Sequence, residues 1–306
     1  MRAEVGEQDA GVRLDVFLGA SMGSRSRAQD AIGSGTVTVN GSPARKRVLL
    51  REGDVVQWSV PDREPSPEPA GDQAATPVPV VLEDEHLLVV DKPAGMATHP
   101  SRGHSTGTLA QALAARVAGG EDPDRAGIVH RLDIGTSGLL VVARDDETHR
   151  ALQEAIAGRQ VAREYLALVG GRPRSRTGTI DAPIGRDRRR RTVHSVDTDR
   201  PREAVTHFEI EEEMAHATLL RVRLETGRTH QIRAHLQAIG LPVVGDPEYG
   251  IEGALGLDRQ FLHAARLSFP HPAGGEVEVA SPLPEDLAAA LARARAGEDP
   301  VEVRPG

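Results

Sequence analysis

The sequence contains no cysteine, which excludes disulfide bridges and any zinc or iron–sulfur centre held by cysteine. No apolar run approaches the roughly 20 residues that a membrane-spanning helix needs. The first residues also lack a basic region followed by an apolar segment, so we expect no secretion signal and a soluble, cytoplasmic protein. Neither a G-x-x-x-x-G-K-S/T loop nor a G-x-G-x-x-G turn is present, and the sequence therefore gives no support for ATP or NAD as a cofactor.

The charge balance, taken alone, argues against nucleic acid as a partner, because the net charge is −8. The distribution weakens this objection. Seven basic residues face four acidic ones between positions 11 and 60, and eight arginines face two aspartates between 172 and 191. The chain is thus expected to carry basic faces on an acidic body.

With 306 residues, of which 39% are apolar, the chain is long enough for two domains with their own cores. Residues 61–79 are rich in proline, alanine and acids and predict an extended linker. Residues 12–60 before it predict a small α/β unit, in which Asn40-Gly41 is a turn signal. The elements expected in that unit are helices over 13–18 and 26–32 and strands over 36–40 and 54–60.

Beyond the linker, residues 80–295 predict one large domain, followed by a flexible tail over 296–306. The elements expected are two strands within 80–100, a helix over 106–118, a strand, loop and strand over 128–145, a helix that Asp145 or Asp146 caps and that runs to about 158, strands within 161–169 and 204–224, and a helix over 228–239. Because no clean βαβ repeat appears, we predict an α+β fold with a mixed, largely antiparallel sheet flanked by helices.

Two segments carry the candidate chemistry: HRLDIGTSG at 130–138 and LETGRTHQIRAH at 224–235. The first places Asp133 among small residues, where a carboxylate can project from a tight loop with little steric cover. The second places Arg233 on a predicted helix. Two simpler interpretations stay open, namely that Asp133 caps a turn and that Arg233 is a surface residue paired with Glu225.

The histidines of these segments do not predict a metal site. His130, His230 and His235 show neither an H-E-x-x-H pattern nor a cysteine partner, and the five-residue step from His230 to His235 does not suit one face of a helix.

Both segments closely resemble the signature motifs of the RluA type of RNA pseudouridine synthase, and the resemblance covers residues from about 12 to 290. It implies the pseudouridine synthase fold and an enzyme that cleaves the bond from ribose to the uracil nitrogen, turns the base, and joins ribose to carbon 5. No redox step occurs, so no cofactor is expected. The reaction needs an activated carboxylate, a water-poor pocket for an unstacked base, and a cation that keeps the carboxylate ionised.

The resemblance also implies the residues that act. Asp133 would be the catalytic nucleophile or base, Arg233 its partner through a bidentate ion pair, and Tyr165 the ring that stacks on the target base. A tyrosine in the core of a strand is the alternative for Tyr165. The sequence departs from the usual pattern at Arg163, where lysine is more common. For phosphate contact the candidates are Arg131 and the run Arg188, Arg189, Arg190 and Arg191, although that run could equally be a solvated hairpin tip.

The unit over 12–60 resembles the small RNA-binding domain of the ribosomal-protein-four type. The residues that carry this resemblance are Arg13, Leu14, Asp15, Leu18, Ser24, Arg25, Ser26, Arg27, Gly35, Val37, Val39, Asn40, Gly41, Gly53 and Asp54. Arg25 and Arg27 at a helix start suit phosphate. This domain in front of this catalytic type indicates large-subunit ribosomal RNA as the partner of a monomeric enzyme. The alternatives are transfer RNA as substrate, a ribosome-assembly factor without catalysis, and a glycosidase, which would need a second carboxylate instead of Arg233.

Overall fold

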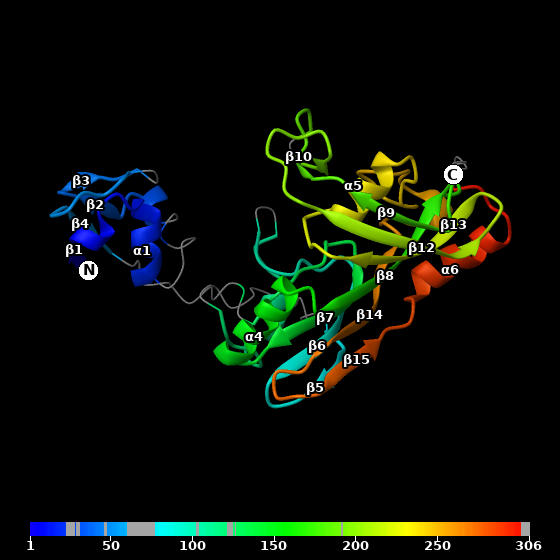
Figure 1. Cartoon of the computed structure of the whole chain (residues 1–306), viewed down its shortest axis with the longest axis horizontal. Coiled ribbons are helices and arrows are strands. Elements are labelled where there is room, and N and C mark those ends of the chain that lie inside the picture. The colour runs from blue at the N-terminus through cyan, green and yellow to red at the C-terminus, as the bar shows by residue number, and fades with distance from the viewer. Residues whose placement is uncertain are drawn as a thin grey trace. The chain divides into compact units, whose positions relative to one another are not determined.

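A computed structural model describes residues 1–22, 28, 31–45, 48–59, 77–101, 104–120, 125, 127–190 and 192–300. Contacts between Cα atoms divide the chain into two compact units, Met1–Ala75 with Gly120–Ala126 and Thr76–Gly119 with Gly127–Gly306 (Figure 1). Most of the predicted linker, 61–79, lies outside the described residues, as do residues 301–306 of the predicted tail. The predicted domain boundaries therefore stay predictions. No helix in the described ranges is long and apolar enough to cross a membrane.

The N-terminal unit packs helix α1 against a small antiparallel sheet. Its elements are β1 (Arg2–Glu4), the 3-10 turn η1 (Glu7–Asp9), α1 (Leu14–Met22), β2 (Val37–Val39), β3 (Ser42–Pro43) and β4 (Val55–Trp58). The strand order is β1-β4-β2-β3. Leu14 and Leu18, one helical turn apart, are fully buried against the sheet. Asn40 and Gly41 both adopt positive φ (51° and 78°), which is the backbone of the predicted hairpin turn. The helix predicted over 26–32 lies largely outside the described residues.

The second unit is built on a nine-stranded sheet in the order β5-β6-β7-β14-β8-β13-β12-β9, with β15 also paired to β14. Its strands are β5 (Val80–Glu83), β6 (Leu87–Lys92), β7 (Ser137–Ala143), β8 (Ala162–Gly170), β9 (Thr177–Asp181), β12 (Val205–Glu213), β13 (Ala217–Leu224), β14 (Leu262–Pro270) and β15 (Glu276–Ala280). All pairings are antiparallel except that of β7 with β14. The mixed, largely antiparallel sheet predicted from the sequence is confirmed.

The described part of this unit also contains four helices. They are α3 (Leu109–Leu113), α4 (Asp146–Ala157), α5 (Gln231–Ala238) and α6 (Glu285–Arg295), with a 3-10 turn, η3 (Ala254–Gly256). The helix α4 lies beside β7 (Figure 1), and its Leu152 joins the buried side chains of β6 and β7 in one core cluster. Asp145 is its N-cap, because its carboxylate accepts the backbone N–H of Thr148 at 2.7 Å.

The structure corrects two predicted helices and one predicted strand. α3 is much shorter than the predicted 106–118: Thr108 begins it with a capping box to Gln111, and it ends at Leu113, where residues 114–116 form a turn. α5 starts three residues after the predicted position, because His230 adopts the left-handed conformation (φ 57°) that a helix cannot include. Of the strand predicted before the loop of 130–138, Ile128 makes only an isolated bridge to Val142. The small hairpin of β10 (Gly185–Arg186) and β11 (His194–Ser195) stands apart from the large sheet.

Candidate active site

Asp133 lies in the loop that leads into β7, and the backbone on both sides of it is held. Thr98 Oγ1 donates to the carbonyl of Leu132 at 2.9 Å and accepts the Leu132 N–H at 3.3 Å. On the other side, the Gly95 N–H donates to the carbonyl of Ile134 at 2.8 Å. The side chain of Asp133 is 16% exposed, so it projects from a fixed loop without being sealed from solvent.

A buried lysine adds a third restraint to the same loop. Lys92, at the end of β6, is fully buried and donates from Nζ to the carbonyls of Met96 at 2.8 Å, Pro93 at 2.9 Å and Ile134 at 3.4 Å. Burial lowers the pKa of Lys92 to about 7, and the negative charge of Asp133 opposes that shift. Lys92 therefore ties the turn after β6 to the loop of Asp133, a contact that motif reading did not assign.

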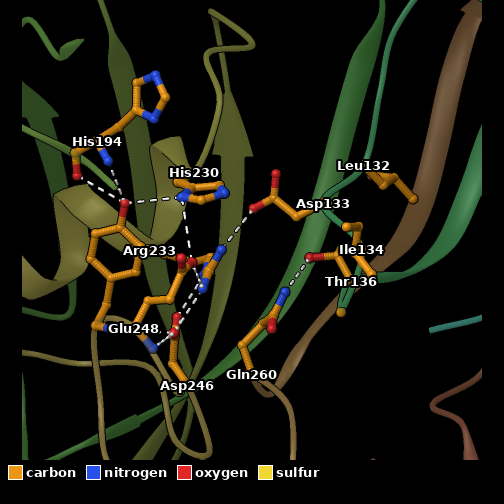
Figure 2. A network of polar contacts seen from close by, with 12 residues as sticks. Leu132, Asp133, Ile134, Thr136, His194, His230, Arg233, Asp246, Glu248 and Gln260 are labelled. Atoms are coloured by element: carbon orange, nitrogen blue, oxygen red, sulfur yellow. Dashed lines mark hydrogen bonds and ion pairs between the residues drawn. The ribbon is translucent and has the colours of Figure 1, made fainter. Parts of the chain in front are cut away.

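The strand β14 and the residues before it close over the small residues of the loop. A Cβ on Gly138, where φ is +114°, would lie 2.3 Å from the carbonyl oxygen of Ala264, so only glycine allows β7 to approach β14 this closely. Gln260 Nε2 donates to Thr136 Oγ1 at 3.1 Å, as Figure 2 shows, and Arg259 Nη1 donates to the carbonyl of Gly135 at 3.0 Å. The loop is thus clamped from a segment about 125 residues away in the sequence.

The structure brings Asp133 and Arg233 together, and the two side chains point toward one another in Figure 2. Arg233 Nη1 donates to Asp133 Oδ2 at 3.3 Å, which is one hydrogen bond and not the bidentate pair expected from the sequence. The bidentate pair goes to Asp246 instead, from Nε to Oδ2 at 2.6 Å and from Nη2 to Oδ1 at 2.8 Å. Arg233 is 4% exposed and Glu225 contacts Arg159 and His207, so the interpretation as a surface arginine is wrong.

Asp246 and Glu248 form an acidic turn that fixes the guanidinium. Asp246 is fully buried, and its Oδ1 also accepts the N–H groups of Glu248 at 2.9 Å and Tyr249 at 3.1 Å. Glu248 Oε2 accepts from Arg233 Nη2 at 2.8 Å, and the Tyr249 ring lies 4.8 Å from Arg233 Cζ. Burial alone would lower the pKa of Arg233, but the hydrogen bond and charge of Asp246, followed by Asp133 and Glu248, raise it above its ordinary value.

The hydroxyl of Tyr249 links this turn to the β10–β11 hairpin. It donates to the carbonyl of His194 at 2.9 Å and accepts the N–H of His194 at 2.8 Å. Since its one hydrogen is directed to that carbonyl, it acts as acceptor for His230 Nδ1 at 3.0 Å, which places the proton of His230 on Nδ1. Burial raises the pKa of Tyr249 above its ordinary value, and burial together with the charge of His230 lowers that of His194.

A pocket opens in front of Asp133 and Arg233. Its lining consists of Arg131, Leu132, Asp133, Thr136, Arg163, Tyr165, Leu224, Gly227, Arg228, Thr229, His230, Gln231, Ile232, Arg233 and Leu262. Tyr165, on β8, is 5% exposed and contributes to this lining, so the three residues proposed from the sequence as catalytic share one pocket. An aromatic ring, a carboxylate and a fixed guanidinium in one pocket can hold a flat polar ring next to an acid.

The predicted phosphate-contacting arginines lie in different places. Arg131 is exposed at the pocket. Arg188, Arg189 and Arg190 lie between β10 and β11, where Asp187 Oδ1 accepts the N–H groups of Arg189 at 2.8 Å and Arg190 at 2.7 Å and so shapes the turn. Arg190 also donates to the carbonyl of Glu248 at 3.3 Å, which connects the turn to the acidic residues around Arg233. Arg25, Arg27 and Arg191 fall outside the described residues.

Comparisons with known proteins agree with the resemblance of the two motifs. A family model described as RNA pseudouridylate synthase matches residues 86–238, and a model of the S4 domain matches residues 12–56. The "Uncharacterized RNA pseudouridine synthase YlyB" of Bacillus subtilis is 43% identical over 92% of this chain and 94% of its own length. The "Ribosomal large subunit pseudouridine synthase D" of Xanthomonas campestris is 43% identical over 94% and 90%. Among solved structures, "Human RNA Pseudouridylate Synthase Domain Containing 1" is 27% identical with a TM-score of 0.57, over 70% of this chain and 86% of that one.

Proposed function

This chain belongs to the RNA pseudouridine synthase family, and on that premise we propose that it converts uridine to pseudouridine in large-subunit ribosomal RNA, with Asp133 as the residue that acts on a flipped nucleotide. The observation that carries the assignment of Asp133 is its contact with Arg233. Arg233 holds Asp133 Oδ2, and among the described residues no side chain or backbone group hydrogen-bonds to Oδ1. One carboxylate oxygen is thus fixed and the other is available to a substrate in the pocket.

The chemistry needs nothing beyond such a pocket. Pseudouridine is an isomer of uridine, so the bond from ribose to nitrogen 1 breaks and the bond from ribose to carbon 5 forms. The hydrogen of carbon 5 leaves as a proton, and nitrogen 1 takes up a proton from water, which keeps the composition unchanged. Asp133 supplies the carboxylate, as nucleophile or as base. Tyr165 stacks on the uracil, an interaction worth about 1–3 kcal/mol per base, and so compensates part of the cost of unstacking the base from the RNA.

Two observations support ribosomal RNA as the substrate. The relative from Xanthomonas campestris that is named for the large ribosomal subunit is similar to 94% of this chain, the N-terminal unit included. The S4 match over residues 12–56 indicates a second RNA-binding element besides the pocket. Transfer RNA is the alternative substrate, and the experiment below distinguishes the two.

The test is tritium release from RNA labelled at carbon 5 of uracil, with unmodified large-subunit ribosomal RNA and transfer RNA in separate reactions. We expect release from ribosomal RNA by the wild-type protein and none by the Asp133→Asn variant, which keeps the size of the side chain. As the matched control, Asp146→Asn removes an exposed carboxylate from the first turn of α4 and should release tritium at the wild-type rate. Release from transfer RNA alone would refute the proposed substrate, and full release by Asp133→Asn would refute the proposed residue.

A further inference from the structure

Arg163 is a buried cation with a donor group left unpaired among the described residues. It lies on β8, is 7% exposed, and its Nε has no hydrogen-bond partner. No described acidic side chain forms an ion pair with it, whereas its neighbour in the pocket, Arg233, has three acidic partners. A guanidinium with a buried, unpaired N–H and no counter-charge is unfavourable, because that N–H has lost its hydration without gaining an acceptor. Such a side chain is stabilised once an anion binds beside it.

The position of Arg163 shows where that anion would lie. Residues 163 and 165 are two apart on one strand, so both side chains point to the same face of the sheet, and both line the pocket of Asp133. Arg163 Nη1 lies 2.8 Å from the place that a Cβ would take on Gly227, in the loop before α5. Glycine at 227 therefore makes room for the guanidinium itself. The first residues of the eight-residue helix α5, Gln231 and Ile232, line the same pocket, and a helix dipole favours negative charge at this end.

The charges around the pocket favour an anion over a neutral group. Four arginines and one aspartate line it, namely Arg131, Arg163, Arg228, Arg233 and Asp133. Of these, Arg233 is neutralised by its acidic partners and Arg228 donates to a backbone carbonyl, that of Glu203. The carbonyl groups of a uracil ring are neutral and would leave the charge of Arg163 uncompensated. A nucleotide that enters the pocket brings its own phosphate, which matches the planar fork of a guanidinium.

We propose that Arg163 binds a phosphodiester of the RNA next to the uridine that stacks on Tyr165, and thereby positions the nucleotide in front of Asp133. This inference rests on the proposed function, because it takes an RNA nucleotide as the occupant of the pocket. Arg163 is a substrate-binding residue in this assignment. Its guanidinium takes no part in bond making or breaking, so its loss should raise KM far more than it lowers kcat.

The first measurement is the affinity for a fluorescein-labelled RNA hairpin with one uridine in its loop, over a range of KCl concentrations. Loss of one phosphate contact in single-stranded RNA makes the slope of log K against log salt shallower by about 0.7. We expect this change, with affinity about tenfold weaker at low salt, for Arg163→Met. Arg163→Lys keeps the charge and should retain the slope. The matched control is Arg266→Met, which removes an arginine that is 53% exposed on β14, and should behave as wild type.

The second measurement uses the wild-type protein, so it does not depend on how well a variant folds. Each phosphate flanking the uridine is replaced in turn by an uncharged methylphosphonate. We expect one position at which the replacement weakens binding by wild type about tenfold and leaves binding by Arg163→Met unchanged. Wild-type binding that is insensitive at every position, or an Arg163→Met variant with the full wild-type slope, would overturn the proposal. Both measurements record binding, so they test Arg163 even if the enzyme does not convert the uridine of the hairpin. An absence of pseudouridine in ribosomal RNA treated with wild-type protein would count against the proposed function alone.

Discussion

Replacing Asp246 by asparagine should lower the free energy of unfolding of the large unit and should also lower kcat. Asp246 is fully buried and accepts four hydrogen bonds, two of them from Arg233. Asparagine has nearly the same shape and keeps one oxygen, but its NH₂ group would face Arg233 Nε. Two hydrogen-bond donors would then lie opposite each other in place of a donor and a carboxylate oxygen. Arg233 would then be a buried cation with only Asp133 and the 35% exposed Glu248 as acidic partners.

The expected loss follows from burial. Removing one member of a buried ion pair costs about 3–5 kcal/mol, which is a large fraction of the 5–15 kcal/mol typical of a folded protein. Because Arg233 also contacts Asp133, its displacement should lower kcat by about tenfold or more. The chain allows a separate reading of its two units. Trp58 is the single tryptophan and lies in the N-terminal unit, so its fluorescence follows that unit while circular dichroism at 218 nm, about the wavelength of β-structure, follows the larger sheet.

Urea unfolding of Asp246→Asn should therefore shift the dichroism transition and leave that of Trp58 in place. The matched control is Glu212→Gln, which breaks another bidentate pair, with Arg295, in which both side chains are at least 35% exposed. Exposed pairs contribute about 0–1 kcal/mol, so this variant should unfold as wild type. A loss of less than about 1 kcal/mol in the free energy of unfolding of Asp246→Asn, or an unchanged kcat, would show that Asp246 does not fix Arg233 beside Asp133.

Three further predictions concern other parts of the site. Tyr165→Leu should raise KM by roughly 5- to 150-fold, whereas Tyr165→Phe keeps the stacking ring and should stay near wild type; equal KM values in steady-state assays of the two variants would rule out stacking. Burial, followed by the charge of Arg163, lowers the pKa of His130 to about 3, so below pH 6.5 the unfolded chain takes up a proton that the folded chain does not. Relative to the His130→Gln variant, the free energy of unfolding of the wild type should thus fall by about 1.4 kcal/mol per pH unit below pH 6.5, and above pH 6.5 the difference between the two proteins should be constant. A constant difference from pH 4.5 to 6.5 in urea unfolding would contradict this. Gly138→Ala should cost about 3 kcal/mol in thermal or urea unfolding, through strain and the clash with Ala264, while Gly107→Ala, with positive φ but open space, should cost only about 1 kcal/mol; similar costs for both would mean that contact with β14 is unimportant.

The sequence predicted local elements better than long-range pairing. Asp145 is predictable as a possible cap because the N-cap hydrogen bond joins residues only three positions apart and therefore depends on local sequence alone. The strand β14 was not predicted, although it lies in the middle of the sheet. Its register shifts between Ala264 and Arg266, and this irregularity interrupts the alternation of buried and exposed residues that marks a strand. The parallel pairing of β14 with β7 has no local signal either, since it joins residues 126 positions apart.

The candidate site shows the same division. Asp133, Tyr165 and Arg233 were named from the two motifs and the tyrosine strand, and the structure places them around one pocket. The acidic residues that hold Arg233 were missed, because the segment Gly-Asp-Pro-Glu-Tyr at 245–249 lies outside both motifs. A signal for them existed. An arginine on a helix whose neighbours Ile232 and Leu236 are core residues needs an acidic partner, and the segment 245–249 after that helix supplies two, Asp246 and Glu248.

The division of the Arg233 donors between two aspartates has a chemical consequence. Had the bidentate pair been formed with Asp133, as the sequence suggested, both oxygens of the carboxylate that we propose to react would be engaged by the same cation. Instead, Asp246 accepts the two hydrogen bonds of the bidentate pair, and Asp133 accepts one hydrogen bond of 3.3 Å. The guanidinium is therefore anchored by Asp246, to which we assign no part in the reaction, and it can stabilise the charge on Asp133 while leaving one oxygen of Asp133 without a hydrogen bond from the described residues. Lysine at 233 could not do both, because a single ammonium group has no rigid second edge, so the arrangement requires arginine.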